Sequence, residues 1–210
     1  MNQFISIPDH ENLVFQHTLN TQAVTSDVAG LVDYVKNRFS KLNHANVLDL
    51  GTGTGIIPFM LRLSFPDWNF TGIEIQEPLY LTACENVKRN HIQNITFINN
   101  NITAIEDYLT ETYDLVIANP PYYRQDQGII STCKEKAIAR HEITANMHDF
   151  IKAARYSLKA NGTALILYPV FRENELMQTT DKLSLKITDK HPLPGNNPKN
   201  QKFIYELKYA

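Results

Sequence analysis

Cysteine is scarce in this sequence, and its scarcity excludes several kinds of protein. Cys84 and Cys133 are the only cysteines among 210 residues, and no spacing pairs them. Disulfide-stabilised secreted domains and structural zinc sites both need more cysteines, in closer patterns. His141 and His148 lie one heptad apart, but no Cys or acidic pattern accompanies them. We therefore expect no disulfide and no metal site.

Long apolar runs are also missing. Every apolar run is far shorter than the roughly 18–20 residues that a membrane span requires. The first residues lack the charged segment and apolar core of a secretion signal. No repeat, low-complexity tract or linker divides the chain, and its length suits one domain of about 100–200 residues or slightly more. We expect a single-domain cytoplasmic protein that is a monomer and does not bind membranes.

Strand-like and helix-like segments alternate along the chain. Short apolar runs predict strands near 46–50, 70–75, 95–98, 114–118 and 163–168. Helical patterns lie at 28–35, after a capping segment 25–27, and at 56–64, 78–90, 102–109, 147–159 and 172–182. This alternation predicts an α/β fold with a mostly parallel sheet and helices on both faces. Two last strands, 183–188 and 203–208, have no helix between them and should be antiparallel.

The segment Asn119-Pro120-Pro121-Tyr122 directly follows the apolar run 113–118. Open α/β sheets place their ligand sites where strands end in this way, and two prolines leave the backbone few conformations. The Asn119 side chain and the Pro120 carbonyl can accept hydrogen bonds, and the Tyr122 ring can stack on a planar base. Asn119, Pro120 and Tyr122 are therefore candidate catalytic residues that hold a flat amino group. The alternative is a rigid turn with a surface tyrosine.

A glycine-rich loop follows the first predicted core strand. Asp49 lies two residues before the first glycine, and Gly51, Gly53 and Gly55 precede an apolar helix. The dinucleotide-binding fingerprint is G-x-G-x-x-G, whereas here the third glycine comes one residue early. Glu74 ends the next strand at about the 20-residue distance expected for a carboxylate that binds ribose hydroxyls. Glycine-rich turns also occur for structural reasons, but loop and acid together favour a cofactor site.

These motifs, in this order, resemble class I S-adenosylmethionine-dependent methyltransferases that modify a planar nitrogen. Within that superfamily the chain looks like the tRNA1(Val) (adenine-N6)-methyltransferase family, through the segments 15–16, 25–27, 73–77, 119–123 and 137–142. The resemblance implies a Rossmann-like sheet of seven strands, mostly parallel with an antiparallel last strand. It also implies S-adenosyl-L-methionine as cofactor and methyl transfer to the N6 amine of an adenosine in tRNA, beside the anticodon of a valine tRNA.

The resemblance further implies a role for individual residues. Those implied to bind the cofactor are Asp49, Gly51, Thr52, Gly53, Gly55, Glu74, Ile75, Asn101, Ile102 and Asn119. Those implied to bind the substrate are Tyr122, Tyr123, Arg124, Arg140 and His141. Asn101 stands where the family usually has an Asp. Residues 1–45 are expected to cover the cofactor, and residues 124–144 to form a substrate loop, although Arg140, His141 and Glu142 could instead cap the next helix.

The net charge of −2 does not favour RNA binding, but the charge is unevenly distributed. Residues 151–210 carry ten Lys and Arg against five Asp and Glu. A local positive face is what phosphate contact requires, so we expect the tRNA side in this part of the chain. Nine of the ten are the expected candidates, namely Lys152, Arg155, Lys159, Arg172, Lys182, Lys186, Lys190, Lys199 and Lys202. The substrate loop adds Arg124, Lys134, Lys136 and Arg140. Taken singly, each could be an ordinary solvated cation.

Three other functions fit parts of the sequence. A protein-glutamine methyltransferase also uses Asn-Pro-Pro-Tyr, but it resembles this chain only after a helical N-terminal domain, and just 45 residues precede Asn46 here. A DNA adenine methyltransferase normally carries a separate target-recognition region, for which residues 124–144 are too short. A non-catalytic nucleoside-binding domain is disfavoured, because Asp49, Glu74, Asn119 and Tyr122 are all present.

Overall fold

The structure is a computed structural model that describes most of the chain. The described residues are 2–7, 10–18, 26–107, 109, 112–124, 138, 142–195 and 200–210. Several predicted features lie outside these ranges, namely Thr25, Cys133, Lys134, Lys136, Arg140, His141, Lys199 and most of the loop 124–144.

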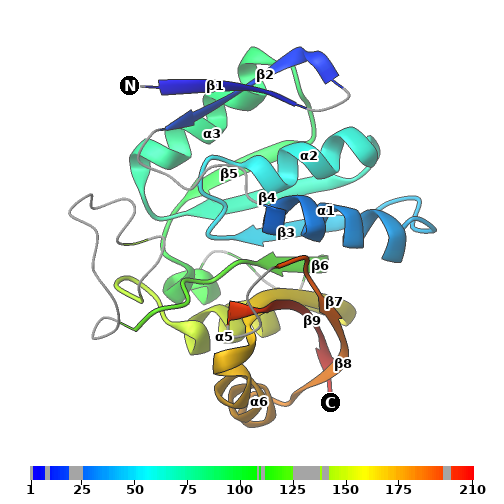
Figure 1. Cartoon of the computed structure of the whole chain (residues 1–210), viewed down its shortest axis with the longest axis vertical. Coiled ribbons are helices and arrows are strands. Elements are labelled where there is room, and N and C mark those ends of the chain that lie inside the picture. Colours follow the sequence, from blue (N-terminus) through cyan, green and yellow to red (C-terminus); the bar gives the residue numbers. More distant parts are fainter. Residues whose placement is uncertain are drawn as a thin grey trace.

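Seven strands form one central sheet (Figure 1). In chain order they are β3 (Asn46–Leu50), β4 (Asn69–Glu74), β5 (Ile95–Asn99), β6 (Tyr113–Ala118), β7 (Leu158–Pro169), β8 (Leu185–Pro192) and β9 (Lys202–Tyr209). Their order in the sheet is β5-β4-β3-β6-β7-β9-β8. The first five pair in parallel, whereas β9 is antiparallel to both of its neighbours. The predicted α/β fold with a reversed last strand is confirmed.

Helices cover both faces of the sheet. They are α1 (Ser26–Arg38), α2 (Ile56–Ser64), α3 (Glu77–Arg89), the 3-10 helix η1 (Ile102–Asp107), α5 (Met147–Ser157), the 3-10 turn η2 (Val170–Arg172) and α6 (Glu173–Lys182). In β6, Leu115 and Ile117 pack with α1 and α2, while Val116 and Ala118 pack with α5 and α6. Successive strand residues point to opposite faces, and β6 is covered on both, so its residues 115–118 are all apolar.

The strand register brings the predicted site residues to one edge of the sheet. Leu50 of β3 pairs with both Ile73 of β4 and Ala118 of β6. Glu74, the last residue of β4, pairs with Asn99 of β5. The loops after these four parallel strands therefore leave the sheet at the same level, and they carry the glycine loop, Glu74, Asn101 and Asn119.

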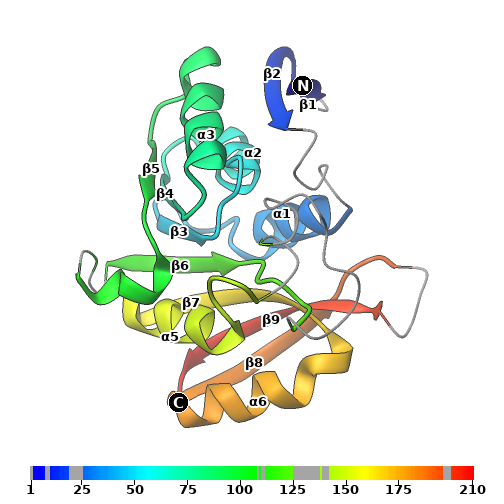
Figure 2. The same cartoon turned by 90° about the vertical axis from the view of Figure 1, so that its left-hand side faces the viewer.

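A β-hairpin near the N-terminus was not predicted. Strands β1 (Asn2–Ile7) and β2 (His10–Thr18) form a separate two-stranded sheet beside α2 and α3 (Figure 2). Phe15 is fully buried, and its ring meets the ring of Phe59 edge-on at 5.2 Å. The backbone N–H of Gln16 donates to Asn86 Oδ1 at 2.7 Å. An isolated hairpin is marginally stable, so these contacts with α2 and α3 determine its formation.

Several element boundaries differ from the predictions, among them those of α1 and β7. Helix α1 begins at Ser26, so Ser26 and Asp27 lie in its first turn and do not precede it as caps. Strand β7 begins at Leu158, five residues earlier than expected, and the residues that precede its apolar run extend it along β6. Within the described ranges, no helix is long and apolar enough to cross a membrane.

Candidate active site

The glycine loop is held by hydrogen bonds within the protein. Gly51, Gly53 and Gly55 all have positive φ angles, of 72°, 59° and 81°, which side chains disfavour. The N–H groups of Gly51 and Thr52 both donate to the carbonyl of Ile73 at 2.9 Å. A pyrophosphate site needs such amides to be directed at the ligand. These two amides are used inside the protein, which argues against dinucleotide binding through them.

Gly53 and Glu74 form a further contact between the loop and the neighbouring strand β4. The Gly53 N–H donates to Glu74 Oε2 at 2.8 Å, and the Gln76 N–H donates to Oε1 at 2.9 Å. A carboxylate has about four acceptor positions, so capacity remains for a ligand hydroxyl. Burial raises the pKa of Glu74, and the backbone N–H groups of Gln76, Gly53 and Ile75 oppose the shift. A Cβ built on Gly53 would meet no atom within 4 Å, so open space lies beside the glycine.

Asp49 is buried beneath the same loop. Its side chain is shielded from solvent, and Oδ2 accepts a hydrogen bond from Thr52 Oγ1 at 2.6 Å. Burial raises the pKa of Asp49 to about 7, with a further contribution from the charge of Glu74, while the Thr52 hydrogen bond acts in the opposite direction. A carboxyl group with a pKa in this range is typical of functional sites.

Gly55 has a packing role that the sequence did not reveal. A Cβ at this position would lie 2.6 Å from Phe97 Cζ and 3.2 Å from Ala83 Cβ. The glycine therefore allows α2 to begin close to β5 and α3, and the space beside it is filled by protein. Gly51 has only ordinary contact distances to Phe150, of 3.4 and 3.5 Å. Among the three glycines, Gly53 is the one with open space beside it.

The residues predicted after β4 and β5 have different environments. Ile75 is exposed, and Ile102 is buried in the core at the start of η1. Asn101 Oδ1 accepts a hydrogen bond from the Thr103 N–H at 3.0 Å. Asn101 thus caps the turn into η1. The side chain of Ile102 points into the core.

Asn119 and Tyr122 contact each other at the end of β6. The Tyr122 hydroxyl donates a hydrogen bond to Asn119 Oδ1. Burial raises the pKa of Tyr122 well above its ordinary value, and the negative charge of Asp27 adds to the shift, so the hydroxyl stays a donor. Sequence reasoning assigned a role to the Tyr122 ring alone, whereas the structure gives the hydroxyl a partner as well. The bond orients the oxygen of the Asn119 amide.

Arg172 holds the turn 119–122 through a hydrogen bond to its backbone, a role that the sequence did not reveal. Its Nη1 donates to the Tyr122 carbonyl at 3.2 Å and to Glu142 Oε1 at 2.7 Å, and Nη2 donates to Glu175 Oε1 at 2.8 Å. The side chain is only 6% exposed. The prediction that Arg172 belongs to the RNA-facing cations is therefore wrong. The only sequence signal for this role was an arginine soon after a buried strand. Its partners Tyr122 and Glu142 are 50 and 30 residues away in sequence, so no local pattern connects them to Arg172.

The two ends of the predicted substrate loop lie side by side. The Glu142 N–H donates to the Tyr123 carbonyl at 2.9 Å. Tyr123 is exposed and stacks on Phe171, with ring centroids 6.4 Å apart. Arg124 forms an ion pair with Glu175 at 2.9 Å, and its side chain is 54% exposed. The other predicted substrate residues, Arg140 and His141, lie outside the described ranges.

Several of the predicted RNA-facing cations form ion pairs within the protein. Lys152 pairs with Glu106, Lys159 with Asp114, Lys190 with Glu173 and Lys202 with Asp27. Arg155 donates to the Leu183 carbonyl at 2.7 Å. Counting positive charges therefore overestimated the charge available to phosphates on this part of the surface.

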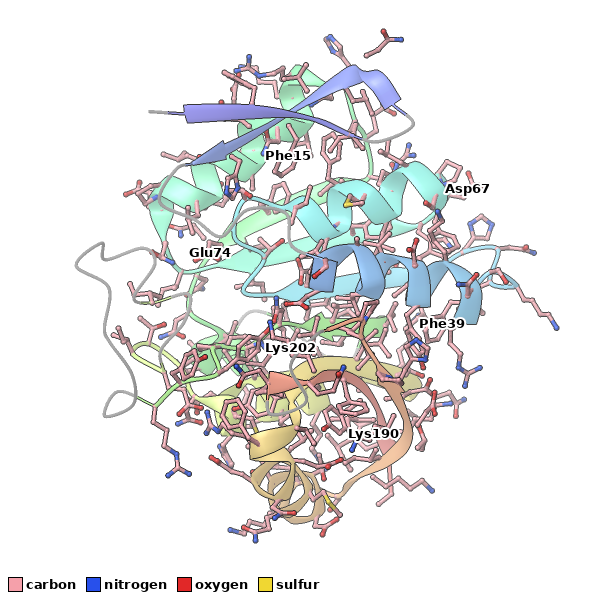
Figure 3. All side chains as sticks on the ribbon, viewed as in Figure 1. Phe15, Phe39, Asp67, Glu74, Lys190 and Lys202 are labelled. Atoms are coloured by element: carbon pink, nitrogen blue, oxygen red, sulfur yellow. The ribbon has the colours of Figure 1, made fainter. Side chains whose placement is uncertain are left out.

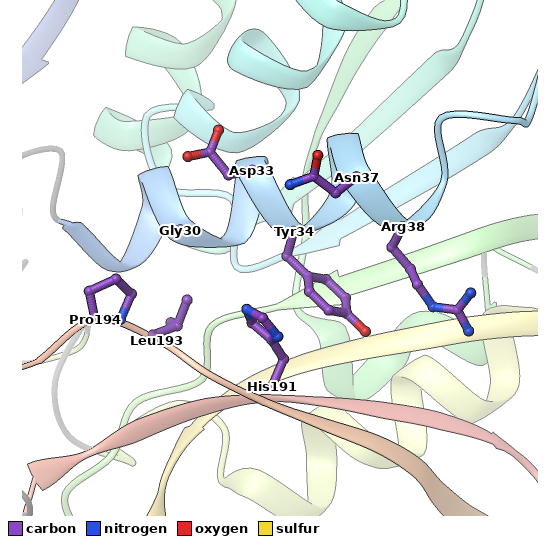
Figure 4. A pocket seen from close by; sticks show the side chains of 8 residues that line it. All are labelled: Gly30, Asp33, Tyr34, Asn37, Arg38, His191, Leu193 and Pro194. Carbon is purple, nitrogen blue, oxygen red and sulfur yellow. The ribbon is translucent and has the colours of Figure 1, made fainter.

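A separate hollow of about 430 Å³ lies between α1 and the end of β8 (Figure 4). Tyr34 and His191 face each other in it, with ring centroids 4.9 Å apart. The Tyr34 hydroxyl donates to Asp189 and Glu206, and Arg38 pairs with Glu206 at 3.1 Å. None of the predicted site residues lines this hollow. In the part of the chain that the structure describes, no three His, Cys, Asp or Glu residues are grouped as a metal site would require.

Comparison with known proteins gives a family and a set of relatives. A family model described as a methyltransferase domain matches residues 41–209. The chain is 32% identical over 143 residues to a tRNA1(Val) (adenine(37)-N6)-methyltransferase of Histophilus somni (strain 129Pt), and the match covers 67% of this chain and 59% of that protein. It is 31% identical over 122 residues to a release factor glutamine methyltransferase of Flavobacterium psychrophilum, covering 58% and 41%. The chain thus spans at most about three fifths of these relatives.

A solved structure supports the fold. The crystal structure of M. jannaschii TYW2 in complex with AdoMet matches with a TM-score of 0.64 at 16% sequence identity, and the match covers 100% of this chain and 87% of that chain. At this identity the likeness concerns the fold, and it agrees with the Rossmann-like sheet expected from the motifs.

Proposed function

The chain belongs to the family of methyltransferase domains, and we propose that it transfers a methyl group from S-adenosylmethionine to the N6 amine of an adenosine in tRNA. The observation that carries the proposal is the position of Asn119 and Tyr122. They follow β6, which pairs with the strand before the glycine loop, so both motifs leave the same edge of the sheet. In open α/β sheets this edge is where ligands bind.

The residues of the loop fit S-adenosylmethionine, which when bound supplies an electrophilic methyl group on a positively charged sulfur. Gly53 has open space beside it, where a side chain would meet no protein atom. Glu74 keeps acceptor capacity for ribose hydroxyls after its two backbone hydrogen bonds. We propose that Glu74 holds the ribose and that the loop 49–55 surrounds the methionine part of the cofactor.

The turn after β6 fits a planar amine. Asn119 Oδ1 has two acceptor positions, and Tyr122 occupies one of them. The second position and the Pro120 carbonyl can each accept one hydrogen of an exocyclic amine. Such a pair of bonds draws the nitrogen lone pair out of conjugation and directs it, so positioning accounts for most of the rate and no charged base is needed. In the transfer the new carbon–nitrogen bond would form as the carbon–sulfur bond breaks, with the neutral thioether as the leaving group. The methylated nitrogen would then release its extra proton to solvent. An adenine in a loop can be unstacked and placed on the Tyr122 ring at modest cost.

The choice of tRNA as substrate rests on the relatives. The protein of Histophilus somni carries the name of a tRNA1(Val) adenine methyltransferase. We propose an adenosine next to the anticodon of a valine tRNA as the finer assignment. The match to a release factor glutamine methyltransferase makes a glutamine side chain the second candidate, because its amide presents a similar planar nitrogen.

One experiment separates these candidates. The protein is incubated with methyl-labelled S-adenosylmethionine and either unmodified tRNA or a release factor, and the products are digested and analysed by mass spectrometry. We expect N6-methyladenosine in the tRNA digest and no methylated glutamine. Methyl on a glutamine, on the ribose or on a ring nitrogen would contradict the proposal, as would failure to bind the cofactor in calorimetry.

A further inference from the structure

Lys202 lies against the aromatic ring on which we propose that the target base stacks. It is the first residue of the reversed strand β9, so it stands at the sheet edge where β6 ends. Its Nζ lies 4.6 Å from the centroid of the Tyr122 ring. The same ammonium forms an ion pair with Asp27 in the first turn of α1. Glu74 and Lys202 are labelled in Figure 3.

The ion pair is shielded from solvent. The side chains of Lys202 and Asp27 are 24% and 16% exposed, so salt screens their interaction less than that of a surface pair. A cation over an aromatic ring is attracted by the negative charge of the ring face. A purine that stacks on this face displaces the ammonium, and a purine on the other face leaves it in place. In both arrangements the ammonium lies beside the target nucleotide.

The carboxylate of Asp27 is stabilised at its position even without the ion pair to Lys202. It lies in the first turn of α1, where the helix dipole stabilises a negative charge. The carboxylate therefore remains favourable at this position without Lys202. A phosphodiester oxygen accepts charge-assisted hydrogen bonds from an ammonium as a carboxylate does, so it can take the place of Asp27.

We propose that Lys202 is a substrate-binding residue, whose ammonium exchanges Asp27 for a phosphate oxygen of the nucleotide that stacks on Tyr122. This inference rests on the proposed function, because it requires a nucleic acid as substrate. Lys152 and Lys159, which belong to the same C-terminal group of cations, pair instead with Glu106 and Asp114. Under this proposal Lys202 favours RNA over a glutamine side chain, which carries no phosphate.

Lys190 offers a matched control. Its Nζ lies 4.1 Å from the centroid of the Phe203 ring, and it forms an ion pair with Glu173 of α6. The chemistry is the same as at Lys202, a lysine over an aromatic ring with a carboxylate partner. The rings differ, since Phe203 belongs to β9 and Tyr122 to the proposed target site. Both lysines are labelled in Figure 3.

The test measures binding of an unmodified anticodon stem-loop of valine tRNA by fluorescence anisotropy at several salt concentrations. We expect Lys202→Met to raise the dissociation constant about tenfold and to reduce the slope of log K against log salt by about 0.7, the value for one contact in single-stranded RNA. Lys202→Arg should stay close to wild type, and Lys190→Met should match wild type. Affinity for S-adenosylmethionine should be the same in all of them.

A second variant separates exchange from a purely structural ion pair. Asp27→Asn removes the competitor for the ammonium, so it should tighten RNA binding at least about twofold. A structural pair predicts weaker or unchanged binding in Asp27→Asn, and that result would overturn the exchange. Equal losses in Lys202→Met and Lys190→Met would also overturn it, because they would indicate a general charge effect. If the wild-type protein methylates RNA and Lys202→Met binds RNA as tightly as wild type, this inference alone is refuted. If the wild-type protein does not methylate RNA, the proposed function and this inference are refuted together.

Discussion

At Tyr122 the ring and the hydroxyl have separate tasks. The ring is the proposed stacking surface, and the hydroxyl donates to Asn119 Oδ1. We expect Tyr122→Phe to lower the single-turnover rate by about twofold to tenfold, the value of one hydrogen bond that orients the amide. Tyr122→Ala should lower it by about tenfold to a hundredfold, because base stacking is lost as well. Full activity in Tyr122→Ala would show that the ring does not carry the base.

Asp49 should make the stability of the protein depend on pH. Burial raises its pKa from the ordinary value to about 7, so the folded state prefers the protonated form. The contribution of protonated Asp49 to the free energy of unfolding is fully present at pH values below about 4 and is lost as the pH rises through 7. We expect the free energy of unfolding to fall by about 2–4 kcal/mol between pH 5 and 8 on account of this group.

Asp49→Asn is the control for that prediction, because Glu74 also has a raised pKa and titrates in both proteins. Urea unfolding of wild type and variant at pH 5 and pH 8 isolates the contribution of Asp49. The variant should gain stability relative to wild type at pH 8. If the free energies of unfolding of wild type and Asp49→Asn differed by the same amount at pH 5 and pH 8, a raised pKa at Asp49 would be refuted.

At the scale of elements, the glycine loop combines a binding role and a packing role. Gly53→Ala places a methyl group into open space beside Glu74, whereas Gly55→Ala places one 2.6 Å from the Phe97 ring. We expect Gly53→Ala to weaken S-adenosylmethionine binding about tenfold or more, with about 1 kcal/mol of backbone strain. Gly55→Ala should cost about 1–3 kcal/mol of stability through overpacking, in addition to the strain of a side chain at its positive φ. Calorimetry and thermal unfolding measure the two effects, and wild-type cofactor affinity in Gly53→Ala would contradict this assignment of the loop.

The turn after β6 depends on η2 and α6 through Arg172. Lysine at this position keeps the charge but loses the planar fork that binds the Tyr122 carbonyl and Glu142 together. We expect Arg172→Lys to lower the methylation rate about tenfold at unchanged cofactor affinity. Arg38→Lys is a suitable control, because Arg38 pairs with the buried Glu206 outside the proposed site. Equal rates in Arg172→Lys and wild type would show that the turn is positioned without Arg172.

The sheet was predictable from the sequence, whereas the supports of the site were not. Residues 115–118 are apolar at four successive positions, and such a run is the local pattern of a parallel strand covered on both faces. The hairpin β1-β2 depends on Asn86, 70 residues from Gln16, and Arg172 depends on Tyr122, 50 residues away. No local pattern reports such distances. The glycine loop and Asn119 could be predicted from the sequence as parts of the site, because each directly follows a predicted strand.

At the scale of the whole molecule, the topology joins segments that are far apart in the chain. Four neighbouring parallel strands end at one level, and the reversed strand β9 adds Lys202 to the same edge. Most of the substrate loop lies outside the described ranges, so its predicted role remains a prediction. Charge counting failed at this scale, because cations such as Lys159 and Lys190 are neutralised by ion pairs that only the fold creates.

The central claim is that Asn119 holds the target amine while the glycine loop holds the cofactor. Its most direct test is Asn119→Ala, measured as the single-turnover rate of N6-methyladenosine formation in tRNA together with S-adenosylmethionine affinity. We expect the rate to fall by about a hundredfold or more and the affinity to fall far less, the pattern of a group that acts mainly in the transition state even where it also touches the cofactor. A wild-type rate in Asn119→Ala, or an equal loss of cofactor affinity, would contradict the account.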